Sequence, residues 1–144
     1  MRHKQGFTLV ELVVVIMILG ILAGVAAPKL INTSGAATDN GLRQTLSIVR
    51  DAIELYAAEN GGRLPPCTTT GADFRAALVP YIRGAFPTSP IGAKNNQVVP
   101  TTGATTTGDA SPTSGWKFNT DDGTFICNSS AATSSISGVT YDQL

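Results

Sequence analysis

The sequence predicts an α+β protein: a long N-terminal α-helix whose second half packs on a small antiparallel β-sheet. Three observations support this prediction. Residues 7–27 are almost wholly apolar, as in a membrane-spanning helix. From Leu42 to Tyr56, apolar residues recur every three or four positions, which is the period of one helix face. Residues 116–127 contain two short runs with aromatic residues on either side of an Asp-Gly turn, which is typical of a β-hairpin.

The apolar run 7–27 is long enough to cross a bilayer. At about 1.5 Å per residue, a helix of this length spans roughly 30 Å, the thickness of the hydrocarbon core. Pro28 and Lys29 follow at the expected membrane boundary. We therefore expect the first half of the helix to be transmembrane, with the lipid bilayer as its partner, and the soluble remainder to have a small core.

The second half of the helix follows the membrane boundary. Residues 32–41 are poor helix formers, so they are either a linker or a weak stretch inside one long helix. Asn60-Gly61-Gly62 ends the second half. The expected organisation is a leader peptide at 1–6, a transmembrane helix at 7–28, the second half of the long helix at 29–60, and a small globular β-domain with long loops at 61–144.

The β-domain is expected to hold few regular elements besides the hairpin. A short helix is expected between Asp73 and Arg83, where Pro80 interrupts the helical pattern. Residues 84–115 are rich in Gly, Pro, Thr and Ser, which is typical of long loops. The Ser- and Thr-rich tail predicts an edge strand near residues 136–141.

Charge and composition argue against two functional classes. The formal net charge is zero, and without residues 1–6 the chain carries eight basic and ten acidic side chains. Such a chain lacks the basic stripe that neutralises phosphates, so direct nucleic-acid binding is not expected. His3, the only histidine, lies in the expected leader, so the processed chain offers no histidine for a nucleophilic triad or a metal site. We therefore expect a protein that is not an enzyme.

The two cysteines, Cys67 and Cys127, both lie beyond the apolar run. An even number of cysteines in an exported chain favours one disulfide, which would close a long loop and stabilise a small domain. The alternative is a pair of buried free thiols. The disulfide is the interpretation that the composition favours.

Glu11 is the only charged residue in the apolar run. An acidic side chain inside a membrane helix costs roughly 2.5–3.5 kcal/mol on insertion scales, and such residues usually have a partner. The run contains no Lys, Arg or His, so the partner is expected from elsewhere. A cut before Phe7 would create an α-amine, and Glu11 of one subunit could pair with the amine of the next.

The stretch Gly6-Phe7-Thr8-Leu9-Val10-Glu11, preceded by a short basic leader and followed by the apolar run, resembles the class III signal of type IV pilins and type II secretion pseudopilins. The resemblance implies that a prepilin peptidase cuts between Gly6 and Phe7 and that Phe7 is then N-methylated. It also implies that Glu11 sets the registration between subunits and that Pro28 is the helix-kinking proline of the family. The partners would be copies of itself or homologous pilins in a helical filament.

The stretch Tyr56–Pro65 is similar to the end of the long helix in major pseudopilins of type II secretion. This likeness implies a structural subunit that polymerises in the bacterial inner membrane on an assembly platform, with a periplasmic C-terminal domain, to drive protein export. A type IV pilus pilin for adhesion, motility or DNA uptake is the first alternative. A secreted soluble binding module is the second, because the small residues near Ala23–Ala27 also fit an ordinary signal peptide.

No cofactor is expected, with calcium as the open alternative. Major pseudopilins have a calcium site in the region that follows their Pro-x-acid-Pro-aromatic-Gly segment, but Pro87–Gly92 departs from that pattern. Asn119, Asp121 and Asp122 could supply oxygen ligands. The same three residue types are common in plain turns, and that is the interpretation we favour.

Overall fold

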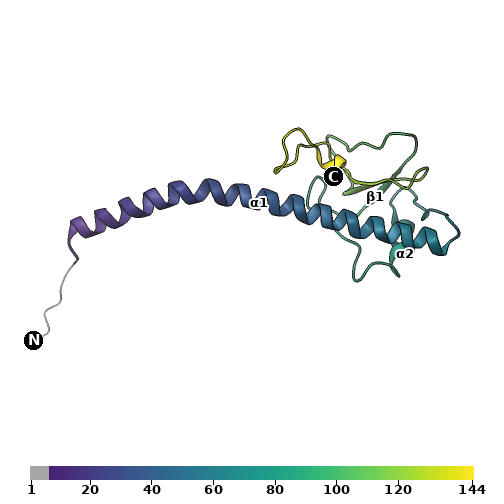
Figure 1. The fold of residues 1–144 in the computed structure, drawn as a ribbon, viewed down its shortest axis with the longest axis horizontal. Helices are drawn as coiled ribbons and strands as arrows, with labels where there is room; N and C mark the ends of the chain where they lie inside the picture. The colour runs from purple at the N-terminus through teal and green to yellow at the C-terminus, as the bar shows by residue number, and fades with distance from the viewer. Residues whose placement is uncertain (1–6) are drawn as a thin grey trace, which may run out of the picture. The chain divides into compact units, whose positions relative to one another are not determined.

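The computed structural model describes residues 7–144, apart from the side chains of residues 30–32. Its elements in chain order are α1 (Leu9–Glu59), α2 (Ala72–Leu78), β1 (Val98–Thr101), β2 (Trp116–Asn119), β3 (Phe125–Cys127) and the short 3₁₀ helix η1 (Tyr141–Gln143) (Figure 1). The chain divides into two compact units after Gly35. We call Ala36–Leu144 the globular unit and residues 7–27 the apolar segment, and we describe each by itself.

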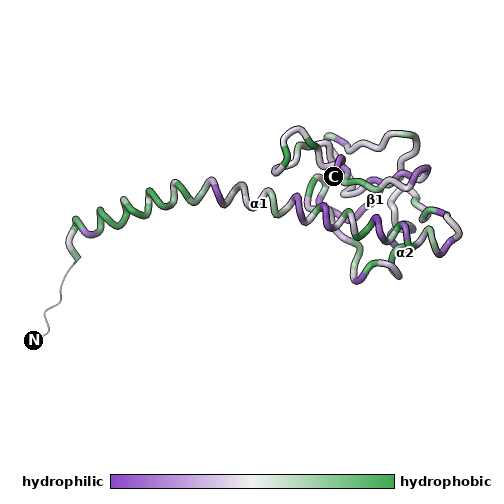
Figure 2. The backbone as a smooth tube through the Cα atoms, viewed as in Figure 1, coloured by the Kyte–Doolittle hydropathy of each residue, from purple (hydrophilic) through white to green (hydrophobic). Residues whose placement is uncertain are grey.

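Helix α1 is continuous from Leu9 to Glu59, so residues 32–41 are helical and do not form a linker. Its apolar segment is hydrophobic along almost its whole length (Figure 2), and Glu11 is the one charged residue in it. Among the described residues, α1 is the one helix that is long and apolar enough to cross a membrane. It ends at the expected glycines, where Gly61 and Gly62 have φ angles of 66° and 84°. The Gly62 amide donates to the Ala57 carbonyl at 2.7 Å, which satisfies one of the last carbonyls of the helix.

The sheet has three strands in the order β1-β2-β3. Strands β2 and β3 are antiparallel, with Trp116 opposite Cys127 and Phe118 opposite Phe125, so the predicted hairpin is confirmed. Strand β1, however, runs parallel to β2, and the sheet is mixed where the sequence predicted an antiparallel one. Pro100 occupies β1, which fits its place at the edge of the sheet because proline cannot donate to a ladder.

Two predictions for the loops and the tail need correction. Residues 84–115 were expected to be loops throughout, yet they contain β1. The predicted edge strand near 136–141 is not formed. Instead, Ala132 and Thr140 make an isolated bridge, and η1 follows it. The reason is that the segment hydrogen-bonds to itself, since the Thr133 amide donates to the Val139 carbonyl at 2.9 Å.

The core of the globular unit forms between α1, α2 and the hairpin. The predicted stripe on α1 is confirmed: Leu42, Leu46, Val49 and Ile53 are at most 4% exposed. Tyr56, the last residue of the stripe, is half-buried and packs against the core. Aromatic rings fill the opposite side: the centroid of Phe74 lies 4.5 Å from that of Phe118, and that of Trp116 lies 5.3 Å from that of Phe125. Helix α2 ends at Leu78, before Pro80, as the sequence predicted.

Candidate assembly site

The apolar segment presents its side chains outward. Every large apolar side chain from Phe7 to Val25 is at least 46% exposed. Fourteen such residues in water would be costly, at about 25 cal/mol for each Å² of apolar surface. A bilayer or the helices of neighbouring subunits would remove this surface from water.

Thr8 and Glu11 form a reciprocal pair at the beginning of α1. The backbone N–H and the hydroxyl of Thr8 both donate to Glu11 Oε2, each at 2.9 Å. The backbone N–H of Glu11 donates to Thr8 Oγ1 at 3.3 Å. This is a capping box, in which the residue before a helix and the third residue within it satisfy each other's backbone amides. The Glu11 carboxylate is therefore held at a fixed place at the helix N-terminus, where the helix dipole also favours it.

The capping box gives Glu11 hydrogen-bond partners inside the apolar run, where the absence of Lys, Arg and His predicts none. The structure supplies neutral donors from Thr8, three residues away, and the described residues contain no ion pair to Glu11. The pattern Thr-x-x-Glu before an apolar run is itself a sequence signal for a capping box, so the pair could have been found.

The other predicted processing and assembly residues lie at the two ends of the apolar segment. Phe7 is 85% exposed directly before the capping box, and Gly6 lies outside the described residues. Pro28 lies inside α1. Because proline has no N–H, the carbonyl of Gly24, one turn earlier, lacks its usual helical partner. The structure thus brings Phe7 and Glu11 to one end of α1 and leaves Pro28 at the other end of the apolar segment.

The comparisons with known proteins match this end of the chain. The family model of the prokaryotic N-terminal methylation motif matches residues 1–27. Type II secretion system core protein G of Aeromonas hydrophila is 35% identical over 72 residues, which are 50% of this chain and 49% of that protein. The type IV narrow pilus major component PilA5 of Thermus thermophilus is 37% identical over 67 residues, 46% of this chain and 56% of PilA5. The N-terminal region of this chain is type IV pilin-like.

The competence protein ComGC of Halalkalibacterium halodurans is a further relative, 36% identical over 64 residues, or 44% of this chain and 62% of ComGC. The chain spans about half of the length of these curated relatives, between 49% and 62%. Their names describe components of secretion systems, of a pilus and of competence, and none of the three is named as an enzyme. No solved structure matches the chain significantly.

Two polar residues of α1 anchor the C-terminal part of the chain within the globular unit. Asp39 is fully buried, and its carboxylate accepts hydrogen bonds from the Ser135 amide at 2.7 Å and the Tyr141 hydroxyl at 2.9 Å. Burial alone would raise the pKa of Asp39, but these hydrogen bonds outweigh it and hold the pKa below its ordinary value. Arg50 donates to the Phe125 carbonyl at 2.9 and 3.1 Å and to the Leu144 carbonyl at 3.1 Å.

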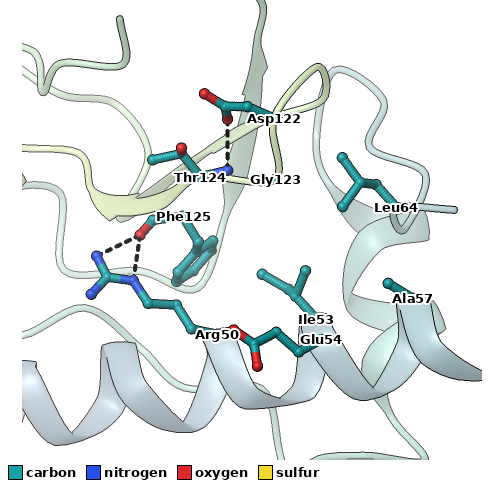
Figure 3. Close-up of a pocket in the computed structure, with 9 residues that line it drawn as sticks. All are labelled: Arg50, Ile53, Glu54, Ala57, Leu64, Asp122, Gly123, Thr124 and Phe125. Atoms are coloured by element: carbon teal, nitrogen blue, oxygen red, sulfur yellow. Dashed lines mark hydrogen bonds between the residues drawn. The ribbon is translucent and has the colours of Figure 1, made fainter. Parts of the chain in front are cut away.

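A cavity of about 380 Å³ lies beside Arg50, between α1 and the hairpin turn (Figure 3). Figure 3 shows the guanidinium reaching the Phe125 carbonyl, so its charge is already engaged with the backbone. Ile53, Leu64 and Phe125 give the lining its apolar part, and Glu54 and Asp122 add two carboxylates. One of these carboxylates is also engaged, since Asp122 Oδ1 accepts the Thr124 amide at 2.8 Å.

The residues considered for calcium act as turn residues. The side-chain oxygens of Asn119 and Asp122 accept the amides of Asp121 and Thr124 at 2.9 and 2.8 Å. Asp121 accepts the Gly103 amide at 2.8 Å. Among residues 7–144 there is no group of three or more His, Cys, Asp or Glu side chains that could hold a metal ion. These contacts match the turn interpretation that the sequence favoured.

The predicted Cys67–Cys127 disulfide is absent, and both residues are free thiols. Cys127 is fully buried on β3, with its Sγ 3.5 Å from Ser89 Oγ, and Cys67 is half-buried in the segment after α1. Burial, with the negative charge of Asp73 nearby, raises the pKa of Cys67 to about 11. An even number of cysteines does not fix the distance between them, and in this fold each packs against the core separately.

Proposed function

We propose that this chain is a structural subunit of a type IV filament-like assembly, and that it acts as a pseudopilin of type II secretion. The subunit waits in the bacterial inner membrane as a single-pass protein with a periplasmic globular unit. A prepilin peptidase cuts between Gly6 and Phe7, and Phe7 is N-methylated. The observation that carries the proposal is a lone carboxylate, Glu11, in an apolar segment whose large apolar side chains from Phe7 to Val25 are all exposed.

The chemistry of assembly follows from the new N-terminus. Cleavage turns the Phe7 amide into an α-ammonium, the one kind of cation that the apolar segment can supply. In a bundle of apolar segments water is excluded, so an ammonium and a carboxylate from neighbouring copies attract strongly at short range. The pair between Phe7 of one copy and Glu11 of the next sets the axial step between subunits. Pro28 bends the helix where the apolar segment ends, which lets bundled helices diverge toward their globular units.

A pilus subunit for adhesion, motility or DNA uptake is the second candidate. The specific observation in its favour is the likeness to a protein named as a pilus major component. A pseudopilin is preferred because a type II secretion core protein is among the relatives and because Tyr56–Pro65 resembles the end of the pseudopilin helix. In either case the inner-membrane assembly platform adds the subunits, and no nucleic acid is bound directly.

Replacing Glu11 with alanine tests the proposal. The Glu11→Ala chain should insert in the membrane at least as well as the wild type, because an intramembrane charge is removed. It should be cleaved but should yield no sheared filaments in a host that assembles the wild type. Asp51→Ala is the matched control, since Asp51 is an exposed acid on the same helix outside the apolar segment, and it should assemble normally. Normal filaments from Glu11→Ala would contradict the pairing mechanism.

A further inference from the structure

We infer that the Lys117 ammonium is a built-in cation that closes the loop between β1 and β2, and that the globular unit therefore folds without calcium. Residues 102–113 of this loop are called the strap. Calcium is the open alternative because Pro87–Gly92 departs from the pseudopilin pattern without excluding a metal. The globular unit alone is concerned, so the proposed function as a filament subunit is not a premise.

The strap is a long segment without helix or strand, and side chains on or beside β2 and β3 hold it in place. Asn119 Nδ2 donates to the Gly103 carbonyl at 2.7 Å and to Thr106 Oγ1 at 2.9 Å. Farther along, the Asp109 amide donates to Asn128 Oδ1 at 3.0 Å. Protein groups therefore fix the strap at several points along its length.

Lys117 holds the middle of the strap. Its Nζ donates to the Thr107 carbonyl and to Asp109 Oδ1, each at 2.8 Å, and its side chain is 14% exposed. Trp116 and Phe118, on either side of Lys117, are fully buried in the core. Because neighbouring residues on a strand point to opposite faces, the Lys117 side chain points to the other face of the sheet, where it meets the strap. Its pair with Asp109 is the one salt bridge among the residues that the structure describes.

The two oxygens that Lys117 contacts are of the kind that calcium prefers, one backbone carbonyl and one carboxylate. The second oxygen of that carboxylate, Asp109 Oδ2, accepts Asn128 Nδ2 at 2.9 Å. The hydrogen bonds from Lys117 and Asn128 hold the pKa of Asp109 below its ordinary value, so the group is ionised at neutral pH. A calcium ion at Asp109 would lie beside the ammonium, where two positive charges repel each other.

The other carboxylates near the strap are also engaged. Asp121 accepts the Gly103 amide at 2.8 Å. Asp142 accepts the Gly108 amide at 2.8 Å through Oδ2 and the Thr140 hydroxyl through Oδ1. Calcium takes about six to eight oxygen ligands, so these carboxylates would have to exchange their present donors for the ion. The donor set around the strap therefore fits the ammonium and does not fit calcium.

Gly108 lets the strap lie directly on the backbone that follows β3. A Cβ atom at Gly108 would be 2.5 Å from the backbone carbonyl carbon of Ser129 and 2.6 Å from its nitrogen. Glycine permits so close an approach of two backbones, and no flexible side chain is there to move aside. Gly108→Ala should therefore lift the strap without changing any charge.

Calcium and a chelator test the inference on the full wild-type chain in detergent micelles. The denaturation midpoint, followed by Trp116 fluorescence, is measured in EDTA, in magnesium chloride and in calcium chloride at equal ionic strength. The calcium concentration is about 10 mM, well above the dissociation constants of weak extracellular sites. The midpoint should be the same in all three solutions. A midpoint that is higher in calcium than in magnesium would overturn the inference.

Lys117→Met keeps the apolar stem and removes the charge, and hydrogen exchange of the Gly108 and Asp109 amides then reports on the strap. Both amides are hydrogen-bonded in the closed strap. The variant should speed their exchange at least about tenfold, the worth of one hydrogen bond to a charged group. Lys94→Met, at an exposed lysine outside the strap, is the matched control and should leave both rates unchanged.

Gly108→Ala is the positive control for an opened strap, and it should speed exchange of the Asp109 amide. Wild-type exchange rates in Lys117→Met would overturn the role of the ammonium, because the strap would then stay closed without it. The calcium comparison uses the wild type alone, so it decides the question even where a variant fails to fold.

Discussion

The two ends of α1 have the same backbone conformation and opposite surroundings. In the apolar segment, Leu19 is 57% exposed, and its large apolar neighbours are exposed on every side. In the globular unit, Leu46 is 1% exposed, and its polar neighbours on the far side of the helix face water. Helix propensity therefore does not decide whether a stretch of α1 is buried or exposed. The distribution of apolar residues around the helix decides whether a stretch packs in its own unit or needs a partner.

The polar residues of α1 divide in the same way. Asp39 and Arg50 are satisfied within the globular unit, by groups far along the chain. Glu11 is satisfied on one oxygen by its own helix turn and has one oxygen open. No buried side-chain nitrogen or oxygen of the globular unit lacks a hydrogen-bond partner, whereas one oxygen of the exposed Glu11 has no partner among the described residues.

A matched pair of leucine substitutions should give the largest difference between the two regions. Leu46→Ala removes buried side-chain atoms and leaves a cavity, so it should lower the free energy of unfolding by about 2–5 kcal/mol. Leu19→Ala should leave that free energy unchanged, because its side chain is 57% exposed and is not part of the core of the globular unit. Fluorescence of Trp116, which is fully buried, follows the unfolding of the full chain in micelles. Equal losses of unfolding free energy from the two variants would contradict the distinction between a buried and an exposed part of α1.

Asp39 should show the next largest effect, and it should depend on pH. Asp39→Asn replaces an acceptor that holds two donors, so it should cost about 1–2 kcal/mol of unfolding free energy at neutral pH. The pKa of Asp39 is lowered in the fold, so this contribution is present above the ordinary carboxyl range and is lost as the pH falls through the lowered value. The unfolding free energies of the wild type and of Asp39→Asn, measured against pH, should therefore converge in acid. A difference that grows as the pH falls would contradict a stabilising role for the ionised Asp39.

Arg50→Lys should have a smaller effect, about 1 kcal/mol of unfolding free energy. Lysine keeps the charge but cannot match the guanidinium, which donates two hydrogen bonds to the Phe125 carbonyl and one to the Leu144 carbonyl. Chemical denaturation followed by near-ultraviolet circular dichroism measures the change. An unchanged denaturation midpoint would mean that water replaces these hydrogen bonds without a loss of stability.

The free thiols should have the smallest effect on stability. A reductant should leave the unfolding midpoint unchanged, because no disulfide is present to break. Cys67 should react slowly in the folded chain, since a pKa of about 11 against 9.0 leaves about 100-fold less thiolate at neutral pH. Iodoacetamide labelling, with the denatured chain as the control, measures the rate. A midpoint that falls on reduction would show that the thiols are bonded.

The features that sequence could predict are those encoded by neighbouring residues. The stripe from Leu42 to Tyr56 follows a helical period, and the hairpin has its turn residues between two short runs, so both were predicted. The end of α1 was predicted because Gly61 and Gly62 adopt φ angles that glycine favours. In each case the deciding information lies within a few positions of the element itself.

The features that were missed depend on distant contacts or on a neutral partner. Strand β1 has four residues with a proline among them, and its parallel partner β2 lies across a long loop. The anchor at Asp39 depends on Ser135, 96 positions away. At the candidate site the residues Phe7 and Glu11 were identified, but Thr8 was missed because only charged partners for Glu11 were considered. The local pattern Thr-x-x-Glu predicts a capping box at this place, and its partners are hydrogen-bonded rather than oppositely charged.

The mass of the N-terminal peptide from the native protein decides whether the chain is processed as a filament subunit. The native chain should begin at Phe7 and carry one methyl group on its α-amine, because the proposed pair with Glu11 of a neighbouring copy needs a freed amine at that position. A native chain that retains Met1, or one that begins beyond Ala27 and has lost the apolar segment, would contradict it.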